Sequence, residues 1–196
     1  MDITASAIIC AVRNHGETGA IVRAFSEEYG ILAGYVQGAR GRQLRPVLIP
    51  GNVITGEWRT RITGQLARLT PEPQHSRAHL LGEPLAIAAI DWVTALTAAT
   101  LAEGVPYPRV YSACDGLLSA IELAPAARVW AGAIAQYETL LLAELGYAED
   151  YDADSAPVAM MAQNRKRLVA HVLGDRRADV MAARERLVER LKRAVA

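Results

Sequence analysis

The spacing of apolar residues changes near residue 71, and this change constrains the fold more than any other feature of the chain. Before it, short apolar and β-branched runs alternate with turn signals, whereas beyond Pro71-Glu72-Pro73 apolar residues recur at helical spacing. A run of strands followed by a run of helices is typical of an α+β protein. We therefore predict two domains, residues 1–74 built from strands and residues 75–196 built from helices.

Five short strands are expected in the first domain. The clearest spans 52–61, where Ile54, Trp58 and Ile62 fall on one side and charged residues on the other. This alternation places Trp58 in the core. Several short strands separated by turns predict a small closed barrel, because closure removes the unpaired edges. The other predicted strands are 6–12, 20–26, 31–37 and 64–70.

Wide apolar faces in the second domain predict a compact helical bundle. Proline favours the first turn of a helix and glycine its end, so these residues mark several of the boundaries. An acidic segment interrupts the helices, and the helices after it are rich in arginine. The predicted elements are a helix from Pro84 to Gly104, one through 110–121, one from Pro125 to Gly146, a loop at 148–157, and helices at 160–173 and 179–195.

The formal net charge is zero, but the charges are unevenly distributed along the chain. Residues 1–77 carry nine basic and six acidic side chains, residues 78–157 two and eleven, and residues 158–196 ten and four. A basic end can meet phosphate while an acidic middle faces a protein partner. The alternative is that these charges belong to ordinary solvated helix faces.

Patterns of catalytic and metal-binding residues are absent from the sequence. There is no Gly-x-Ser-x-Gly nucleophile turn and no Walker loop. His75 and His79 have the spacing of ligands on one helix face, but no third ligand accompanies them. Cys10 and Cys114 lie in apolar runs without a Cys-x-x-Cys pair. We therefore expect a protein that is not an enzyme and holds no metal or cofactor.

Targeting signals and membrane spans are not expected either. The N-terminus lacks a basic segment followed by an apolar stretch, so no signal peptide is predicted. Residues 85–101 are apolar, but the run is short for a membrane span and Asp91 interrupts it. Together with two unpaired cysteines, these features favour a cytoplasmic protein in a reducing compartment.

Residues 30–45 favour nucleic-acid binding, because an apolar strand runs into a loop rich in glycine and arginine. Guanidinium groups bind phosphate or carboxylate in a planar, bidentate way, and no acid lies among them in the loop. Tyr35 is a candidate for base stacking. The residues predicted to bind DNA are Arg23, Tyr35, Arg40, Arg42, Arg45, Arg59, Arg61 and Arg68.

The order of several short motifs resembles the bacterial RecO family of recombination mediators. These are Asn14-His15-Gly16-Glu17, Glu27-Glu28-Tyr29-Gly30, Gly38-Ala39-Arg40-Gly41-Arg42 and Leu140-Leu141-Leu142-Ala143-Glu144-Leu145-Gly146-Tyr147. The resemblance covers about residues 5–147. It implies an N-terminal five-stranded OB-fold barrel followed by an α-helical domain.

The resemblance also implies a function in DNA repair and recombination. Members bind single- and double-stranded DNA, anneal complementary strands and help RecA load onto single strands covered by single-stranded DNA-binding protein. The implied partners are DNA, RecR and the acidic C-terminal tail of that binding protein, in the cytoplasm at the nucleoid. For the tail, Arg109 and Arg128 are candidates, and Arg128 is favoured by its predicted place near the start of the third helix.

One departure from the family concerns zinc. Several family members carry a cysteine zinc module after the Leu-Gly-Tyr segment, whereas Tyr147 is followed here by residues without cysteine, and the region beyond it looks shorter than usual. We therefore predict no zinc.

Two rival functions remain open. The first rival is a protein adaptor whose barrel arginines bind an acidic protein. The second is a hydrolase with an unrecognised site.

Overall fold

The computed structural model describes residues 2–60, 62, 64–124, 126–147, 157–174 and 178–195. The chain divides into two compact units. The first, called the barrel unit here, joins Met1–Gly82 to Leu101–Pro108. The second, called the helical unit, joins Glu83–Thr100 to Arg109–Ala196. A short segment between two helices is thus part of the barrel unit, although the spacing of its residues gave no sign of this.

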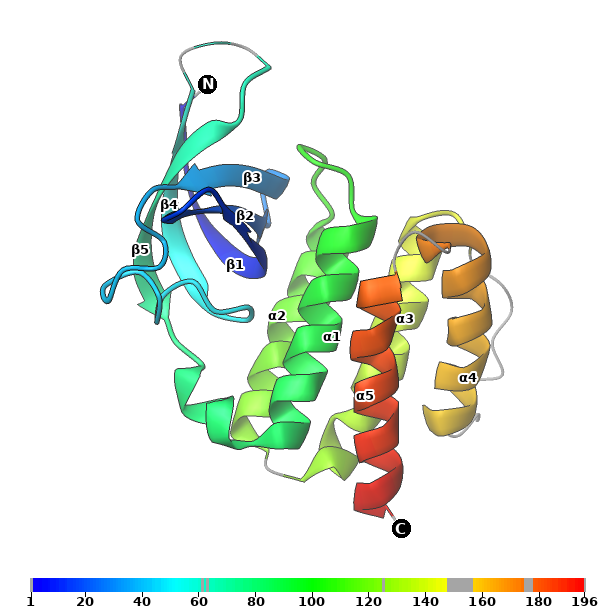
Figure 1. The fold of residues 1–196 in the computed structure, drawn as a ribbon. Helices are drawn as coiled ribbons and strands as arrows, with labels where there is room; N and C mark the ends of the chain where they lie inside the picture. The colour runs from blue at the N-terminus through cyan, green and yellow to red at the C-terminus, as the bar shows by residue number, and fades with distance from the viewer. Residues whose placement is uncertain are drawn as a thin grey trace. The chain divides into compact units, whose positions relative to one another are not determined.

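The barrel unit is a closed barrel of five strands, in the spatial order β1-β2-β3-β5-β4 (Figure 1). All neighbouring strands are antiparallel except β3 and β5, which pair in parallel. This topology confirms the predicted five-stranded barrel of the OB-fold type. The strands are β1 (Asp2–His15), β2 (Gly19–Ser26), β3 (Gly30–Val36), β4 (Val53–Arg59) and β5 (Ala67–His75).

Strand β1 closes the barrel because it is long enough to pair with two neighbours. Its first half pairs with β4 from Asp2 to Ile8, and its second half pairs with β2 from Ile8 to His15. The pairing of β1 with β2 contains a register shift between Ile9 and Ala11, and most of the pairs between these two strands lie beyond that shift. Extra residues of this kind bend a strand and increase its twist, which suits a strand that turns from one neighbour to the next. The predicted strand at 6–12 was therefore too short.

Strand β5 corrects the prediction that the sheet ends at Pro71-Glu72-Pro73. The strand continues to His75, with Pro71 opposite Gly56 and Pro73 opposite Ile54 on β4. Its pairing with β3 is limited to Ala67 and Arg68, so beyond Arg68 one side of β5 is an edge. Along a strand, the N–H groups of residues two apart point to the same side. Pro71 and Pro73 are two apart, so both can place the position of the missing N–H group on the unpaired side of β5, where no hydrogen bond is lost.

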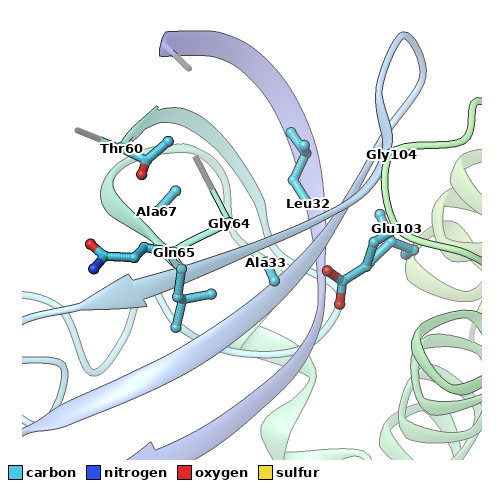
Figure 2. A pocket seen from close by; sticks show the side chains of 10 residues that line it. Leu32, Ala33, Thr60, Gly64, Gln65, Ala67, Glu103 and Gly104 are labelled. Carbon is cyan, nitrogen blue, oxygen red and sulfur yellow. The ribbon is translucent and has the colours of Figure 1, made fainter. Parts of the chain in front are cut away.

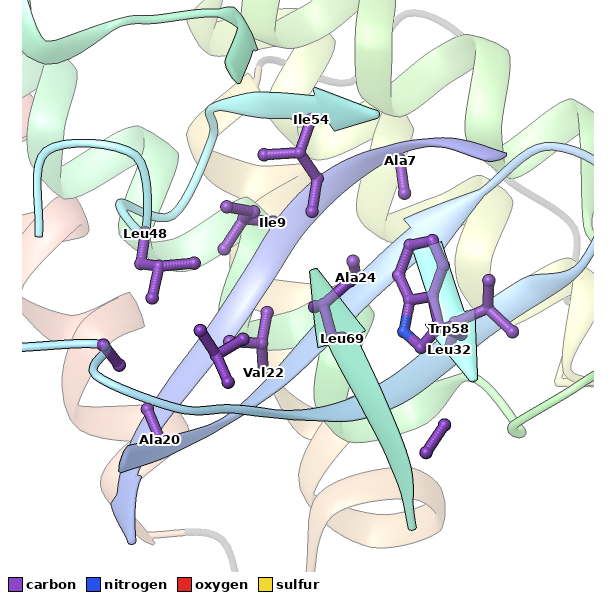
Figure 3. Packing of buried hydrophobic residues seen from close by; sticks show 13 residues of the cluster. Ala7, Ile9, Ala20, Val22, Ala24, Leu32, Leu48, Ile54, Trp58 and Leu69 are labelled. Atoms are coloured by element: carbon purple, nitrogen blue, oxygen red, sulfur yellow. The ribbon is translucent and has the colours of Figure 1, made fainter. Parts of the chain in front are cut away.

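Trp58 is part of the barrel core, as its alternation predicted (Figure 3). Its side chain is fully buried, and two glycines make room for the indole. A Cβ at Gly56 would lie 2.4 Å from the indole ring, and one at Gly34 would lie 3.0 Å from it. Ile62 was expected on the same side as Trp58. It is 57% exposed instead, because β4 ends at Arg59.

The helical unit holds the α-helices predicted for the second half of the chain. Residues 148–156, most of the predicted acidic loop, and Pro125, the predicted opening of a helix, lie outside the described residues. Among the described helices, none combines the length and the apolar character that crossing a membrane requires. The elements that follow the barrel strands are η1 (Ala78–Gly82, in the barrel unit), α1 (Pro84–Thr100), α2 (Pro108–Leu123), η2 (Ala127–Val129), α3 (Ala131–Glu144), α4 (Pro157–Arg167), the π-helical η3 (Leu168–Leu173) and α5 (Ala178–Val195).

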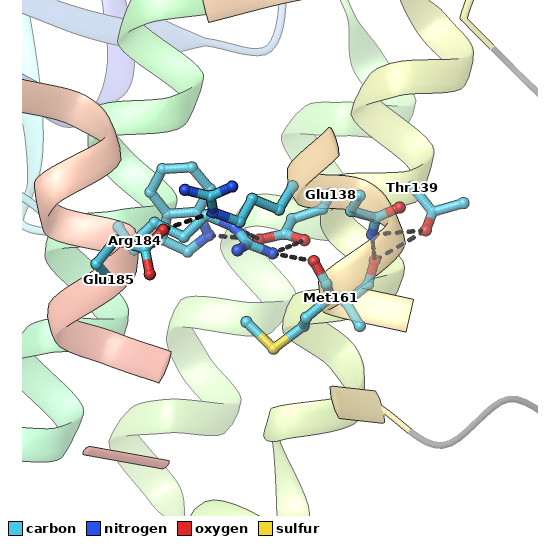
Figure 4. A network of polar contacts seen from close by, with 9 residues as sticks. Glu138, Thr139, Met161, Arg184 and Glu185 are labelled. Atoms are coloured by element: carbon cyan, nitrogen blue, oxygen red, sulfur yellow. Dashed lines mark hydrogen bonds and ion pairs between the residues drawn. The ribbon is translucent and has the colours of Figure 1, made fainter. Parts of the chain in front are cut away.

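A buried ion pair and the hydrogen bonds around it join four helices of this unit (Figure 4). Arg184 of α5 donates to both carboxylate oxygens of Glu138 on α3, at 2.9 and 3.0 Å, and also to the carbonyl of Met161 on α4. The indole N–H of Trp92 on α1 donates to Glu138 at 2.9 Å. Burial raises the pKa of the Glu138 carboxyl, and the facing guanidinium opposes that rise. An arginine of the basic C-terminal segment is therefore used inside the protein.

Candidate nucleic-acid interface

The arginine-rich loop between β3 and β4, residues 37–52, is anchored to the barrel rather than extended into solvent. Ala39 and Leu48 are buried in the barrel core, and Leu44 and Val47 pack against the same core. Short turns link the anchors, with the N–H of Arg45 donating to the carbonyl of Gly41 at 3.0 Å. Four apolar anchors in one loop fix the backbone from which its cations project.

The base of this loop is closed by a buried asparagine. The Asn52 side-chain amide donates to the carbonyls of Pro46 and Val47, at 3.1 and 3.0 Å. Its carbonyl oxygen accepts from the backbone N–H of Arg77 at 2.8 Å. The Arg77 guanidinium in turn donates to the carbonyl of Gly51. Because Arg77 follows β5, these bonds tie the loop to the far end of the sheet.

The three arginines of the loop are exposed. Arg40 is also tied to the turn between β1 and β2, since its guanidinium donates to the carbonyl of Glu17 at 3.0 Å. In the part of the chain that the structure describes, no ion pair occupies Arg40, Arg42 or Arg45. An anchored loop with unneutralised guanidinium groups is suited to bind phosphate at low entropic cost.

A second set of predicted residues forms a row across the outside of the barrel. Tyr35 on β3 is in register with Arg68 on β5, and Arg68 is in register with Arg59 on β4. Side chains at paired positions share a face of the sheet, so these three lie side by side. Arg59 and Arg68 are exposed, and Arg59 also contacts Glu57 at 3.0 Å. This row was not evident from the sequence, because strand register sets it.

Tyr35 is half-buried, with its ring lying against the backbone of the neighbouring strand. A Cβ at Gly19 would lie 2.3 Å from the Tyr35 hydroxyl oxygen. The rings of His15 and Tyr35 meet edge to face, with centroids 6.0 Å apart and planes at 82°. Glycine at position 19 therefore lets the tyrosine ring lie flat on β2, which leaves a rigid aromatic surface beside the arginine row.

Arg23 and Arg61 differ from the other predicted DNA-binding residues. The Arg23 side chain is 29% exposed and forms an ion pair with Glu103, in the segment between α1 and α2 that belongs to the barrel unit. The backbone of that segment also pairs with β3, where the N–H of Gly104 donates to the carbonyl of Ile31 at 3.0 Å. Arg23 thus holds this segment on the barrel, and Arg61 lies outside the described residues.

A hollow of about 470 Å³ lies between β3, this segment and the connection from β4 to β5 (Figure 2). Among the described residues that line it, Glu103 is the one with a charged side chain, and its carboxylate does not favour phosphate. Its lining residues are Ile31, Leu32, Ala33, Thr60, Gly64, Gln65, Leu66, Ala67, Glu103 and Gly104.

The two arginines predicted to bind a protein tail lie in the helical unit. Arg109, at the start of α2, forms a 2.8 Å ion pair with Glu144, at the end of α3. Arg128 is exposed in the short turn η2, before α3 begins at Ala131. The predicted advantage of Arg128, a place in the first turns of the third helix, is therefore wrong.

The two histidines considered as metal ligands do not share a helix face, because His75 ends β5 and His79 lies in η1. Among the described residues, no three histidine, cysteine, aspartate or glutamate side chains are grouped closely enough to hold a metal ion.

Comparison with known proteins places the chain in a family. The Recombination protein O N-terminal family model matches residues 1–77, and the Recombination protein O C-terminal family model matches residues 81–194. The chain belongs to the RecO family. The two matches cover the barrel strands and nearly all of the described helices, in agreement with the resemblance found in the motifs.

Curated relatives carry the same family name. The DNA repair protein RecO of Gluconacetobacter diazotrophicus is 35% identical over 78% of this chain and 61% of the relative. The DNA repair protein RecO of Ruegeria sp. is 36% identical over 80% of this chain and 64% of the relative. That of Paracoccus denitrificans is 36% identical over 76% and 61%. The RecO chain described here thus spans less than two thirds of these relatives.

Proposed function

We propose that this chain is a DNA repair and recombination mediator that binds single- and double-stranded DNA and anneals complementary strands. The observation that carries the proposal is the anchored loop with exposed Arg40, Arg42 and Arg45, which lacks ion pairs within the described residues. Sequence-independent binding to DNA depends on such phosphate contacts. The names of the curated relatives, DNA repair protein RecO, support the same biological role.

The proposed surface has two parts that serve different atoms of a strand. The loop arginines neutralise phosphates, and the row of Tyr35, Arg68 and Arg59 offers an aromatic ring beside two cations that can bind the backbone of the strand. Stacking of a base on an aromatic ring contributes about 1–3 kcal/mol. Neutralising the phosphates of two strands lowers their mutual repulsion. Complementary bases then meet without any chemical step, which is consistent with a protein that is not an enzyme.

A salt titration with paired variants tests the proposal. Arg42→Ala with Arg45→Ala should weaken binding of a fluorescent single-stranded oligonucleotide and reduce the salt slope by about 0.7 for each lost contact. Arg190→Ala with Lys192→Ala removes two exposed cations of α5 and is the matched control. If the two double variants weaken oligonucleotide binding equally, the binding is explained by non-specific charge attraction and the loop has no special role. No oligonucleotide binding by the parent chain at moderate salt would favour the rival protein adaptor.

The partner proteins are also proposals: the acidic tail of single-stranded DNA-binding protein, RecR and, through them, RecA. A hollow of about 360 Å³ between α2 and α3 fits the apolar part of such a tail. Arg109 lies one turn before Ala113, and Glu144 one turn beyond Leu140, so their ion pair lies near one end of this groove. The lining residues are Ala113, Gly116, Leu117, Ala120, Ala133, Gln136, Tyr137 and Leu140.

Filling this groove tests the tail proposal independently of DNA. A Cβ added at Gly116 meets no atom within 4 Å, so Gly116→Leu should occupy the hollow without a backbone clash. We expect this variant to lose binding to a labelled peptide with an apolar, acidic C-terminus and to keep its oligonucleotide affinity. Gly132→Leu, at the other glycine of the two helices, is the control. Unchanged peptide affinity in Gly116→Leu would exclude the groove as the receptor.

A further inference from the structure

We propose that the segment Leu101–Pro108 restrains DNA binding by the barrel unit, and that a bound DNA strand loosens this segment from β3. The Glu103 carboxylate occupies the Arg23 guanidinium in the place that a DNA phosphate takes when it binds. The DNA surface thus has a competitor for phosphate that belongs to the protein itself. This regulation concerns the barrel surface described above and therefore rests on the proposed function.

Strand register places Arg23 on the same outer surface as the proposed stacking ring. Arg23 on β2 is in register with Ala33 on β3, and Ala33 precedes Tyr35 by two residues. Successive side chains of a strand point to opposite faces, so residues two apart share a face, and diagonal neighbours on adjacent strands lie close together. A DNA strand whose base stacks on Tyr35 therefore brings its phosphates close to Arg23.

The ion pair between Arg23 and Glu103 has the features of one that a phosphate can replace. The guanidinium Nη1 donates to a single carboxylate oxygen, so the pair is not of the bidentate kind that binds most strongly. The Nε–H of Arg23 is buried and has no hydrogen-bond partner among the described residues. The two side chains are 29% and 54% exposed, so water and salt screen their attraction. A phosphate that is held by other contacts along its strand can compete with such a partner.

Besides this ion pair, the backbone of the segment holds it to the start of β3. The N–H of Gly104 donates to the carbonyl of Ile31 at 3.0 Å, and Glu103 forms an isolated parallel bridge with Ile31. Leu101 is buried, whereas residues 102–106 are exposed. The start of the segment is thus anchored, and loss of the ion pair lets the exposed part open locally without unfolding of the barrel.

The charge of Glu103 makes this opening respond to DNA. Its carboxylate lies beside the place of any phosphate bound at Arg23, and like charges brought together repel one another. Bound DNA therefore takes the guanidinium and also drives the carboxylate away. Because linkage between two binding events is reciprocal, a change that lifts the segment from β3 should in turn strengthen DNA binding.

Hydrogen exchange at the Gly104 amide tests the proposal on the full chain, because this N–H donates to Ile31. The probe is a saturating single-stranded oligonucleotide at low salt, and exchange is measured by NMR. We expect bound oligonucleotide to speed the exchange about two- to fivefold, as the loss of one exposed ion pair allows. Unchanged or slower exchange in a chain that binds the oligonucleotide would overturn the proposal alone. No binding by the parent chain would contradict the proposed function as well.

A second test lifts the segment without changing any charge. A Cβ at Gly30 would overlap the carbonyl oxygen of Val105, so Gly30→Ala should push the segment from β3. We expect this variant to bind single-stranded oligonucleotide about two- to fivefold more tightly. Gly64→Ala is the matched control and should leave the affinity unchanged. Both glycines have a positive φ, 68° at Gly30 and 87° at Gly64, but a Cβ at Gly64 meets no atom within 4 Å.

The gain in affinity must depend on Arg23. Adding Arg23→Ala to Gly30→Ala should abolish the gain, and an equal gain without Arg23 would overturn the proposal. Circular dichroism of each variant checks its fold. If Gly30→Ala does not fold, the same cycle is measured with Glu103→Gln, which removes the competing charge and leaves the backbone as it is. A gain in Glu103→Gln that persists without Arg23 would overturn the proposal in the same way.

Discussion

The two units of the molecule use arginine in opposite ways. In the helical unit Arg184 is 2% exposed, lies 5.7 Å from the centre of the Trp92 ring and donates to Glu138. In the barrel unit Arg42 and Arg45 are exposed on a loop whose apolar side chains, not its cations, enter the core. A buried arginine helps to specify how helices pack, whereas an exposed one on a fixed backbone is available to a ligand.

The difference shows why a count of charges along the sequence is a poor guide to a binding surface. Residues 158–196 carry the largest excess of basic residues. Yet Arg165, Arg184 and Arg193 of that segment are all engaged with acids. The smaller excess in residues 1–77 leaves three cations of one loop exposed together, and this arrangement is the better candidate for DNA.

The largest expected effect is the loss of stability caused by breaking the buried ion pair between Glu138 and Arg184. Glu138→Leu leaves the Arg184 guanidinium without its carboxylate, which should lower the free energy of unfolding of the helical unit by about 3–5 kcal/mol. Denaturant titration followed by circular dichroism measures this loss. Glu185→Leu, which breaks the exposed pair with Arg165, should cost at most about 1 kcal/mol. Similar losses in both variants would mean that the two ion pairs, buried and exposed, are equivalent.

A smaller effect is expected at the base of the arginine loop. Asn52→Ala removes two donated hydrogen bonds and the acceptor for the Arg77 N–H, so the unfolding free energy of the barrel unit should fall by about 1–3 kcal/mol. Affinity for single-stranded DNA should fall with it, because the loop arginines lose their fixed backbone. Asn14→Ala, on an exposed stretch of β1, is the control. A lower unfolding free energy with unchanged affinity for single-stranded DNA would mean that the anchoring of the loop does not contribute to DNA binding.

Arg23 allows a test of whether a barrel arginine that forms an ion pair within the protein can be made available to DNA. Glu103→Gln removes its partner, so we expect single-stranded DNA to bind about two- to fivefold more tightly at low salt, with a salt slope steeper by about 0.7. Glu72→Gln, on the outside of β5, is the matched control for the loss of a negative charge. If both variants gain equally, the effect is one of net charge, and Arg23 has no special role.

The smallest effect concerns pH. Burial raises the pKa of Asp91 on α1, and Arg186 on α5 lowers it in part. A raised folded-state pKa favours the fold below the unfolded value of about 3.9, and this contribution is lost as pH rises through the folded-state pKa. Asp91→Asn should therefore gain stability relative to the parent between pH 4 and pH 7. A constant difference in urea midpoint across that range would contradict this.

The barrel and the helices were largely predictable from the sequence because each depends on local periodicity. Alternation along β4 was enough to place Trp58 in the core. The extension of β5 through two prolines was not predictable, since only the partner strands show which side of β5 is an edge. The same holds for the row of Tyr35, Arg68 and Arg59, which depends on register between three strands.

Long-range pairs explain what local patterns missed at the candidate site. Arg23 and Glu103 are 80 residues apart, and Glu138 and Arg184 are 46 apart. An arginine that will meet such a partner looks in the sequence like one that will not. The loop arginines were distinguishable because glycines and the absence of acids nearby marked them, and even there the four apolar anchors were overlooked.

The barrel unit is assembled from two stretches of chain, and this has a practical consequence for dissecting the protein. A fragment made by stopping at Gly82 would lack Leu101–Pro108. Such a fragment would expose the backbone of Ile31 and strip Arg23 of its counter-ion, offering an unsatisfied edge to other molecules. DNA affinity measured on that fragment would include a cation that the intact chain keeps engaged, so truncation would exaggerate the very activity it was meant to isolate.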